Sequence, residues 1–142
     1  MAHYAKHGIR FRYPDDWDIA EERLEEGVCV TVAGEGTSFW SVSLYDGAPR
    51  PEDVIDTAVE AFRDEYDELD EYPVESRLAG VPNVGRDIEF VSLDVLNTAC
   101  VRSFRAGDAT AFVLYQADDR DLEETREILE GISASLVCEI AS

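Results

Sequence analysis

Histidine, the side chain most often used for acid–base and metal chemistry near neutral pH, occurs only as His3 and His7. Their four-residue spacing would let both imidazoles bind one metal ion if the segment were helical. Because no acidic residue lies between them and chain ends often fray, we expect a solvated terminal segment instead. Any Cys–His or Ser–His–Asp machinery would have to reach back to this segment, so we expect no triad catalysis.

Carboxylates are the most numerous side chains that could do chemistry. Asp87 and Glu89 alternate on one expected strand and share a face, as an acid–base pair would. The acidic runs 64–71 and 118–121 could bind Ca²⁺, but neither has the ligand spacing and central glycine of an EF-hand loop. With 32 Asp and Glu residues in 142, such groupings arise by chance. We therefore expect a solvated acidic surface with loosely associated counter-ions, no catalytic residue, no cofactor and no metal site.

A glycine turn and four arginines are the candidate anion-binding features. Gly34-Glu35-Gly36 follows an expected strand, but it leads to another strand and lacks lysine, which argues against a phosphate loop. Arg10 and Arg12 alternate with apolar residues of the first strand, and Arg102 and Arg105 belong to a later one. If these arginines converged, they could hold an anionic ligand. Separate pairing with the many surface acids is the simpler expectation.

The three cysteines, Cys29, Cys100 and Cys138, show no C-x-x-C spacing, and each lies in an apolar run. Free cysteine behaves as a small apolar residue and is often buried in proteins of reducing compartments. We therefore expect buried free thiols in a cytoplasmic protein. A catalytic or metal-bound cysteine is the alternative.

The charge composition limits the partners of the chain. Its formal net charge of −20 disfavours contact with nucleic-acid phosphates and with anionic membrane surfaces. No apolar stretch is long enough to span a bilayer, and the N-terminal residues lack the apolar region of a secretory signal. We expect a cytoplasmic protein that binds neither nucleic acid nor membrane, whose partner is another protein with a basic surface.

Lys6 is the only lysine, and the other cations are arginines. So many carboxylates in a small domain repel one another unless salt screens them. We therefore propose that the protein works in a salty cytoplasm or belongs to a strongly acidic proteome. The alternative is that the acidity serves solubility and has no salt dependence.

The hydrophobic pattern supplies the elements that would position these residues. Two amphipathic helices are expected, one from Pro51 with an apolar stripe from Val54 to Leu69, and one from about Arg120 to Leu136. Turns are expected at 14–16, 80–83 and 97–98. Strands are expected at 9–13, 19–24, 28–33, 39–45, 72–79, 86–96, 99–105 and 109–117. Short connections require antiparallel pairing, so residues 1–142 form one α+β domain in which both helices pack on one continuous, mostly antiparallel sheet.

This pattern resembles the PsbP/Mog-type fold family. The features that carry the resemblance are the opening segment 9–17, Ile-Arg-Phe-Arg-Tyr-Pro-Asp-Asp-Trp, the helix after Pro51, the meander and the final helix ending in residues 132–136, Ile-Ser-Ala-Ser-Leu. The family includes extrinsic photosystem subunits, a Ran-binding nuclear transport factor and bacterial proteins that resemble chaperones for secreted effectors. The resemblance implies an α/β/α sandwich that binds proteins without catalysis. It assigns no binding residue in this chain.

Two functions from different classes follow. The first is a non-catalytic protein-interaction module, an adaptor or chaperone-like protein, which would show an open strand edge or an exposed apolar patch. The acidic helix face 52–71 would attract its basic partner, unless that face serves solubility alone. The second is a small-molecule-binding domain or enzyme, with a deep apolar pocket between sheet and helix.

Overall fold

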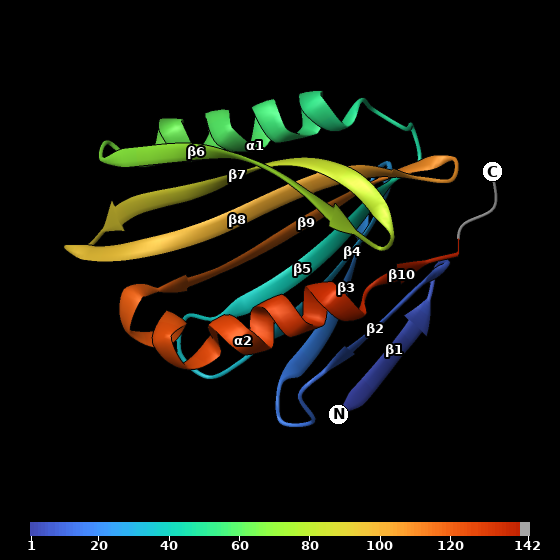
Figure 1. Cartoon of the computed structure of the whole chain (residues 1–142), viewed down its shortest axis with the longest axis horizontal. Coiled ribbons are helices and arrows are strands. Elements are labelled where there is room, and N and C mark those ends of the chain that lie inside the picture. The colour runs from blue at the N-terminus through green and yellow to red at the C-terminus, as the bar shows by residue number, and fades with distance from the viewer. Residues whose placement is uncertain (140–142) are drawn as a thin grey trace.

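The computed structural model describes residues 1–139 (Figure 1). Its elements in chain order are β1 (Ala2–Lys6), β2 (Ile9–Tyr13), β3 (Asp18–Leu24), β4 (Gly27–Ala33), β5 (Phe39–Tyr45), α1 (Pro51–Glu65), β6 (Leu69–Leu78), β7 (Val81–Ser92), β8 (Val95–Ala106), β9 (Ala109–Asp118), α2 (Asp119–Ser135) and β10 (Val137–Cys138). All strand pairs are antiparallel. The expected α+β class, with two helices on a mostly antiparallel sheet, is confirmed.

The strands form two sheets. A seven-stranded sheet has the order β3-β4-β5-β9-β8-β7-β6, and a three-stranded sheet has the order β1-β2-β10. The expectation of one continuous sheet is therefore wrong. The first expected strand, Ile9–Tyr13, pairs with β1 and β10 and not with the meander.

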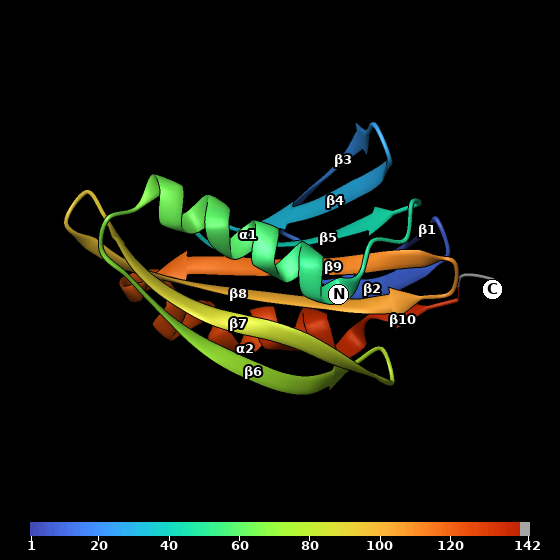
Figure 2. The ribbon, with the colours of Figure 1, turned by 90° about the horizontal axis from the view of Figure 1, so that it is seen from above.

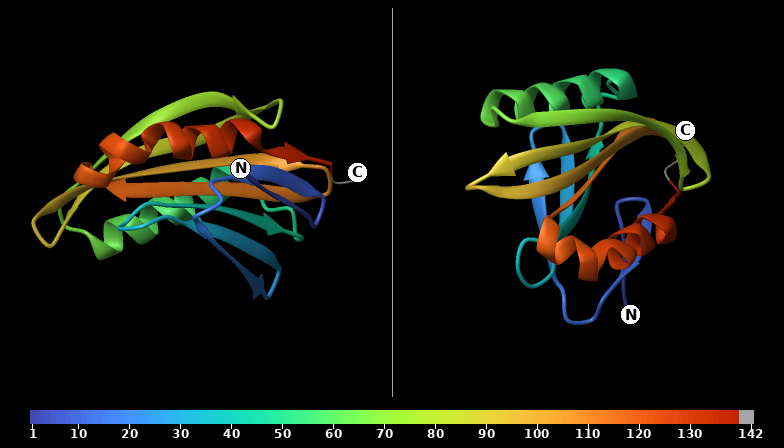
Figure 3. Two further views of the ribbon diagram at one scale, coloured as in Figure 1. Left: turned by 90° about the horizontal axis from the view of Figure 1, so that it is seen from below. Right: turned by 60° about the vertical axis from the view of Figure 1, so that its left-hand side comes forward.

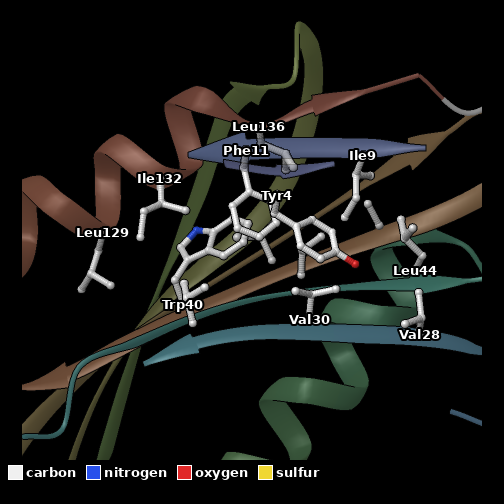
Figure 4. Packing of buried hydrophobic residues seen from close by; sticks show 14 of the residues in the cluster. Tyr4, Ile9, Phe11, Val28, Val30, Trp40, Leu44, Leu129, Ile132 and Leu136 are labelled. Carbon is white, nitrogen blue, oxygen red and sulfur yellow. The ribbon is translucent and has the colours of Figure 1, made fainter. Parts of the chain in front are cut away.

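Helix α2 and the small sheet cover one face of the large sheet (Figure 3). Alternating residues of β4, β5 and β9 point to this face, so that Val30, Val42 and Val113 are cross-strand neighbours. Trp40 lies under α2 and the small sheet (Figure 4), 4.8 Å between ring centroids from Phe11. Its indole Nε1 donates a 2.9 Å hydrogen bond to Ser133 Oγ of α2. This satisfied polar contact fixes the helix on the larger of two apolar cores.

Helix α1 lies on the opposite face, over β7, β8 and β9 (Figure 2). Ile55 and Val59 of the helix pack with Ile88 and Phe90 of β7 in the second core. The two helices therefore enclose the large sheet, as the expected α/β/α arrangement requires. Strand β9 contributes side chains to both cores, because Val113 points to the larger core and Phe112 to the second.

Several expected boundaries are wrong. Helix α1 ends at Glu65, because Tyr66 is extended (φ −122°) and stacks on Phe90 at 4.2 Å between ring centroids. The turn expected at 97–98 lies instead at Leu93-Asp94, which have positive φ values of 52° and 64°, as a type I′ hairpin turn requires. The turn expected at 80–83 is Ala79-Gly80, and residues 81–83 begin β7.

Candidate functional site

The outer face of β3, β4 and β5 lies open beside α1 (Figure 2). The side chains opposite to the buried valines of β4 and β5 point to it, and Thr31 pairs with Ser41 and Cys29 with Ser43 across the strands. Ser41 Oγ donates a hydrogen bond of 3.2 Å to the carbonyl of Leu114. We call this surface the open face, because no helix covers it, and define it by Cys29, Thr31, Ser41, Ser43 and Tyr45. The small side chains of Ser41 and Ser43 are only 7% and 6% exposed between their neighbours, and the other three are half-buried.

A hollow of about 450 Å³ separates the open face from α1. Its apolar walls come from Tyr45 of β5, Phe112 of β9 and small residues of the helix. Burial raises the pKa of the Tyr45 hydroxyl above its ordinary value of 10.0. The complete lining is Glu26, Tyr45, Pro49, Asp53, Val54, Thr57, Ala58, Ala61 and Phe112. We call it the α1 hollow.

The segment between β5 and α1 places the helix beside the hollow. The hydroxyl of Thr110 donates to the carbonyl of Pro49, and Arg105 Nη1 donates to the carbonyl of Ala48 at 3.3 Å. Pro51 then occupies the first helical turn, where its missing N–H leaves no unsatisfied donor and its φ suits the helix. The helix start is thus attached to the ends of β8 and β9.

The solvent-facing side of α1 is strongly acidic. Its exposed carboxylates are Glu52, Asp53, Asp56, Glu60, Asp64 and Glu65. Arg63 is the only cation within α1, residues 51–65, and it pairs with Glu71 of β6. Asp53 and, from the β3–β4 turn, Glu26 bring carboxylates to the rim of the α1 hollow. The expected acidic helix face exists over residues 52–65, but residues 69–71 of the expected face lie in β6. An apolar floor with a carboxylate rim suits a positively charged, partly apolar partner.

Strand β3 forms one edge of the large sheet and β6 the other. From Asp18 to Arg23, every residue of β3 is exposed. Glu21 is attached to the small sheet, since it accepts a hydrogen bond from Tyr4 and lies 3.6 Å from His7 Nε2. Burial and the bond to Glu21 raise the pKa of Tyr4, and the same bond lowers the pKa of Glu21.

The expectation of a frayed end is wrong, because residues 2–6 form β1, although both histidines are exposed to solvent as expected. His3 is an exposed residue of that strand, and His7 lies in the turn after it. The helical spacing that a shared metal ion needs is therefore absent. Within residues 1–139, no three His, Cys, Asp or Glu side chains are grouped to hold a metal ion.

The four arginines do not converge within the described part of the chain. Arg10 pairs with Glu139 at 3.1 Å and, like Arg12, is exposed on the small sheet. Arg105 contacts the segment before α1. Arg102 is buried under α2, with 8% of its surface exposed. The hypothesis that the four arginines converge on an anionic ligand is therefore wrong. For Arg10 and Arg102 the simpler expectation of separate ion pairs is confirmed.

Arg102 belongs to a satisfied polar cluster. Its Nη2 lies 2.7 Å from Asp87 Oδ1, and its Nη1 donates to the carbonyls of Arg86 at 3.0 Å and Val101 at 2.9 Å. A hollow of about 250 Å³, lined in part by Arg102, Tyr115 and Glu130, lies beside it. Since most donors of the guanidinium are already bonded, we interpret this cluster as structural.

The acidic run 118–121 contributes contacts that stabilise the fold. Asp118 caps α2 by accepting from the backbone N–H of Asp121 at 2.8 Å. Asp121 accepts from Thr37 N and Thr37 Oγ1, each at 2.7 Å, and these bonds lower the pKa of its carboxyl group. The loop 34–36 thus connects two strands, as expected, and the hydrogen bonds of Asp121 to Thr37 attach the end of the loop to α2.

The expected carboxylate pair of β7 is not a separate acid–base pair. Asp87 and Glu89 share the α2-facing side of β7, but Asp87 pairs with Arg102.

The cysteines are all free. Cys100 is buried, and burial raises the pKa of its thiol to about 12. Cys138 is half-buried, and burial raises its pKa to about 11. Cys29 is also half-buried but belongs to the open face, with its Sγ 3.8 Å from Thr31 Oγ1. Full burial was therefore a correct expectation for Cys100 alone.

Sequence reasoning missed the open face and the α1 hollow. The available signal was the small side chains Ala58 and Ala61 on the helix side that faces Tyr45 and Phe112. Their significance depends on which strands α1 covers, and periodicity does not give that.

Comparisons with known proteins support the fold. No protein-family model and no curated protein matches the sequence. Among solved structures, cyanobacterial PsbP of Synechocystis is similar, with a TM-score of 0.60 and 12% identity over 96% of this chain and 91% of that one. LpqN, involved in cell envelope biogenesis of Mycobacterium tuberculosis, gives 0.59 and 14% over 98% and 89%. PA94 of Pseudomonas aeruginosa, of unknown function, gives 0.60 and 14% over 99% of each chain.

No helix among residues 1–139 has the length and apolarity needed to cross a bilayer. At these identities the structural neighbours bear on architecture alone, and they agree with the expectation taken from the opening segment 9–17, the helix after Pro51 and the meander. The chain has a PsbP-like fold.

Proposed function

We propose that this chain is a non-catalytic protein-interaction module, an adaptor or chaperone-like protein, whose partner is a protein with a basic surface. The observation that carries the proposal is the α1 hollow, an apolar depression at the border of the open face with carboxylates on its rim. Contiguous apolar surface of this kind on a monomer often marks a binding site. The acidic helix beside it would speed association with a cationic partner and orient it.

The side chains around the open face favour binding over catalysis. Ser41 is bonded to a backbone carbonyl, and Cys29 lies next to Thr31 rather than next to a base. Both histidines belong to the small sheet and its turn, and His7 is directed to Glu21. A nucleophile needs a base within hydrogen-bond reach, and the open face supplies none among the described residues.

Two charge variants of the full chain test this function. In the α1 variant, four carboxylates become amides: Asp53→Asn, Asp56→Asn, Glu60→Gln and Asp64→Asn. In the matched α2 variant the same number change on the opposite side of the sheet: Asp119→Asn, Glu123→Gln, Glu124→Gln and Glu127→Gln. All eight are exposed, and each set includes one carboxylate of a first helical turn.

Each form would be used as bait in native lysate at matched salt, and captured proteins would be identified by mass spectrometry. We expect a basic protein to be retained by the unmodified chain and by the α2 variant but lost from the α1 variant. Equal loss from both variants would point to net charge alone and contradict the proposal.

A small-molecule-binding domain or enzyme remains the second candidate, because the volume of the α1 hollow is within the range of small-molecule sites. Ala61→Phe would fill the hollow while leaving the charges of α1 unchanged. A small molecule that co-purifies with the chain, persists in the α1 charge variant and disappears with Ala61→Phe would favour this candidate.

A further inference from the structure

We propose that β3 is a docking edge, to which the partner adds an extended, basic segment as an eighth strand of the large sheet. This inference rests on the proposed protein-interaction function and specifies the conformation of the bound segment. Strand β3 pairs with β4 along its whole length, from Asp18 to Leu24, and is the last strand on that side of the sheet. Its outer row of backbone N–H and C=O groups is therefore available to another strand.

The two edges of the sheet differ in a way that favours β3. Strand β6 contains Pro73, which has no N–H to donate and is a common device for protecting an edge. Residues 18–24 contain neither proline nor glycine, so every residue of β3 has a backbone donor and a side chain that can pack on an added strand. Of the two edges, β3 therefore better matches the open strand edge that we expect of an interaction module.

The charge on β3 identifies the occupant. Asp18 and Glu22 point to the same side as the open face, with Ala20 between them, because they pair with Ala33 and Cys29 of β4. Opposite charges on directly facing residues stabilise strand pairs, and like charges destabilise them. An added strand that carries Arg or Lys four residues apart and a small residue between them would complement this side of β3.

Glu21, on the other side of β3, opposes pairing with a second copy of this chain. In an antiparallel pair of β3 strands centred on Glu21, the two Glu21 side chains would face each other directly. The net charge of −20 on each copy adds further repulsion. The side chains therefore protect the edge from self-pairing and leave it accessible to a cationic strand.

Strand addition is tested with a synthetic peptide of about ten residues in which arginine occurs at every fourth position and threonine elsewhere. This pattern is cationic and compatible with a strand, and it places a threonine between successive arginines on the same face. The control peptide keeps the arginines but has proline in place of threonine at alternate positions, which keeps the charges and removes alternate backbone donors. Amide hydrogen exchange of the full chain, followed by NMR, would be measured with each peptide at a KCl concentration where the chain is folded.

The arginine–threonine peptide should slow exchange of β3 amides by about tenfold or more at saturation, since outward N–H groups become hydrogen-bonded. The arginine–proline peptide should not. Protection should be lost in the Asp18→Lys/Glu22→Lys variant and kept in the Asp70→Lys/Glu75→Lys variant, which alters exposed residues of β6 in the same way. Unchanged protection of β9 amides without peptide would show that both variants fold.

Three results would overturn the inference. If both peptides perturb only α1 and leave β3 amides unprotected, β3 is not the docking edge, although the proposed interaction function stands. If the β6 variant loses protection as well, the effect is one of net charge. If β3 amides are protected without peptide and the chain is dimeric by light scattering, a second copy occupies the edge.

Discussion

Gly85 faces Arg102 across the β7–β8 ladder, so closely that a β-carbon on Gly85 would lie 2.6 Å from Arg102 Cδ. The absence of a side chain on β7 at this point lets the arginine extend along the sheet surface. Its guanidinium group thereby reaches Asp87 on the same strand and the carbonyl of Arg86. A glycine in a strand interior is otherwise unfavourable, so this close approach explains its presence.

Gly85→Ala should therefore destabilise the protein. The added methyl group would contact Arg102 and the backbone carbonyl of Val101, and overpacking of this kind reduces the free energy of unfolding by about 1–3 kcal/mol. Gly131→Ala is the control, because a β-carbon there has open space and Gly131 lies within α2. That change should stabilise the chain by about 0.5–1 kcal/mol. Urea denaturation of both variants would show these opposite signs, and a neutral Gly85→Ala would contradict the packing argument.

The two partners of the Arg102–Asp87 ion pair should differ in their effect on stability. The side chain of Asp87 is 39% exposed and that of Arg102 only 10%. Asp87→Asn leaves a buried cation without its counter-charge, and we expect a loss of about 2–3 kcal/mol. Arg102→Met removes the cation and leaves Asp87 in contact with water, so the loss should be smaller, about 1–2 kcal/mol. Denaturation midpoints in which Arg102→Met is the more damaging change would reject this account.

The local elements of this fold were readable from sequence, whereas their assembly was not. Period-two alternation located β2 and β5, runs of apolar and β-branched residues located β4 and β9, and the apolar stripes located both helices. Alternation does not tell which sheet a strand joins, so β2 was placed in the large sheet although it pairs with β1 and β10.

Two further errors came from tertiary contacts that overrule local preference. Tyr66 continues the helical stripe, yet it leaves the helix to stack on Phe90. Leu93 is a poor residue for positive φ, and Asn97 is a better one, so the β7–β8 turn was expected too late. For the candidate site, the acidic side of α1 was predicted, but the hollow beside it depends on how far the helix covers the sheet.

The contact between Asp121 and Thr37 should make part of the stability pH-dependent. Bonds from Thr37 lower the pKa of Asp121 below its ordinary value of 3.8. A carboxyl group whose pKa is lower in the folded state binds protons more readily when the chain is unfolded. The stability that Asp121 contributes is therefore fully present above pH 3.8 and is lost as the pH falls through the lowered pKa. Asp121→Asn should therefore be less stable than the unmodified chain at neutral pH, and the difference should shrink in acid. Urea midpoints measured at pH values from neutral into strong acid would check it, and a constant difference would contradict it.

Salt should raise the stability of the whole chain. A net charge of −20 on 142 residues produces repulsion that the folded state concentrates, and molar salt shortens the screening length from about 8 Å at physiological strength to about 3 Å. Thermal melts in dilute and then molar KCl should show a rise in Tm of roughly 5–10 °C. The α2 variant, with four carboxylates neutralised, should show a smaller rise because it has less repulsion to screen. An unchanged or lower Tm in molar KCl would leave solubility as the reason for the acidity, and would mean that repulsion among the carboxylates does not destabilise the folded state.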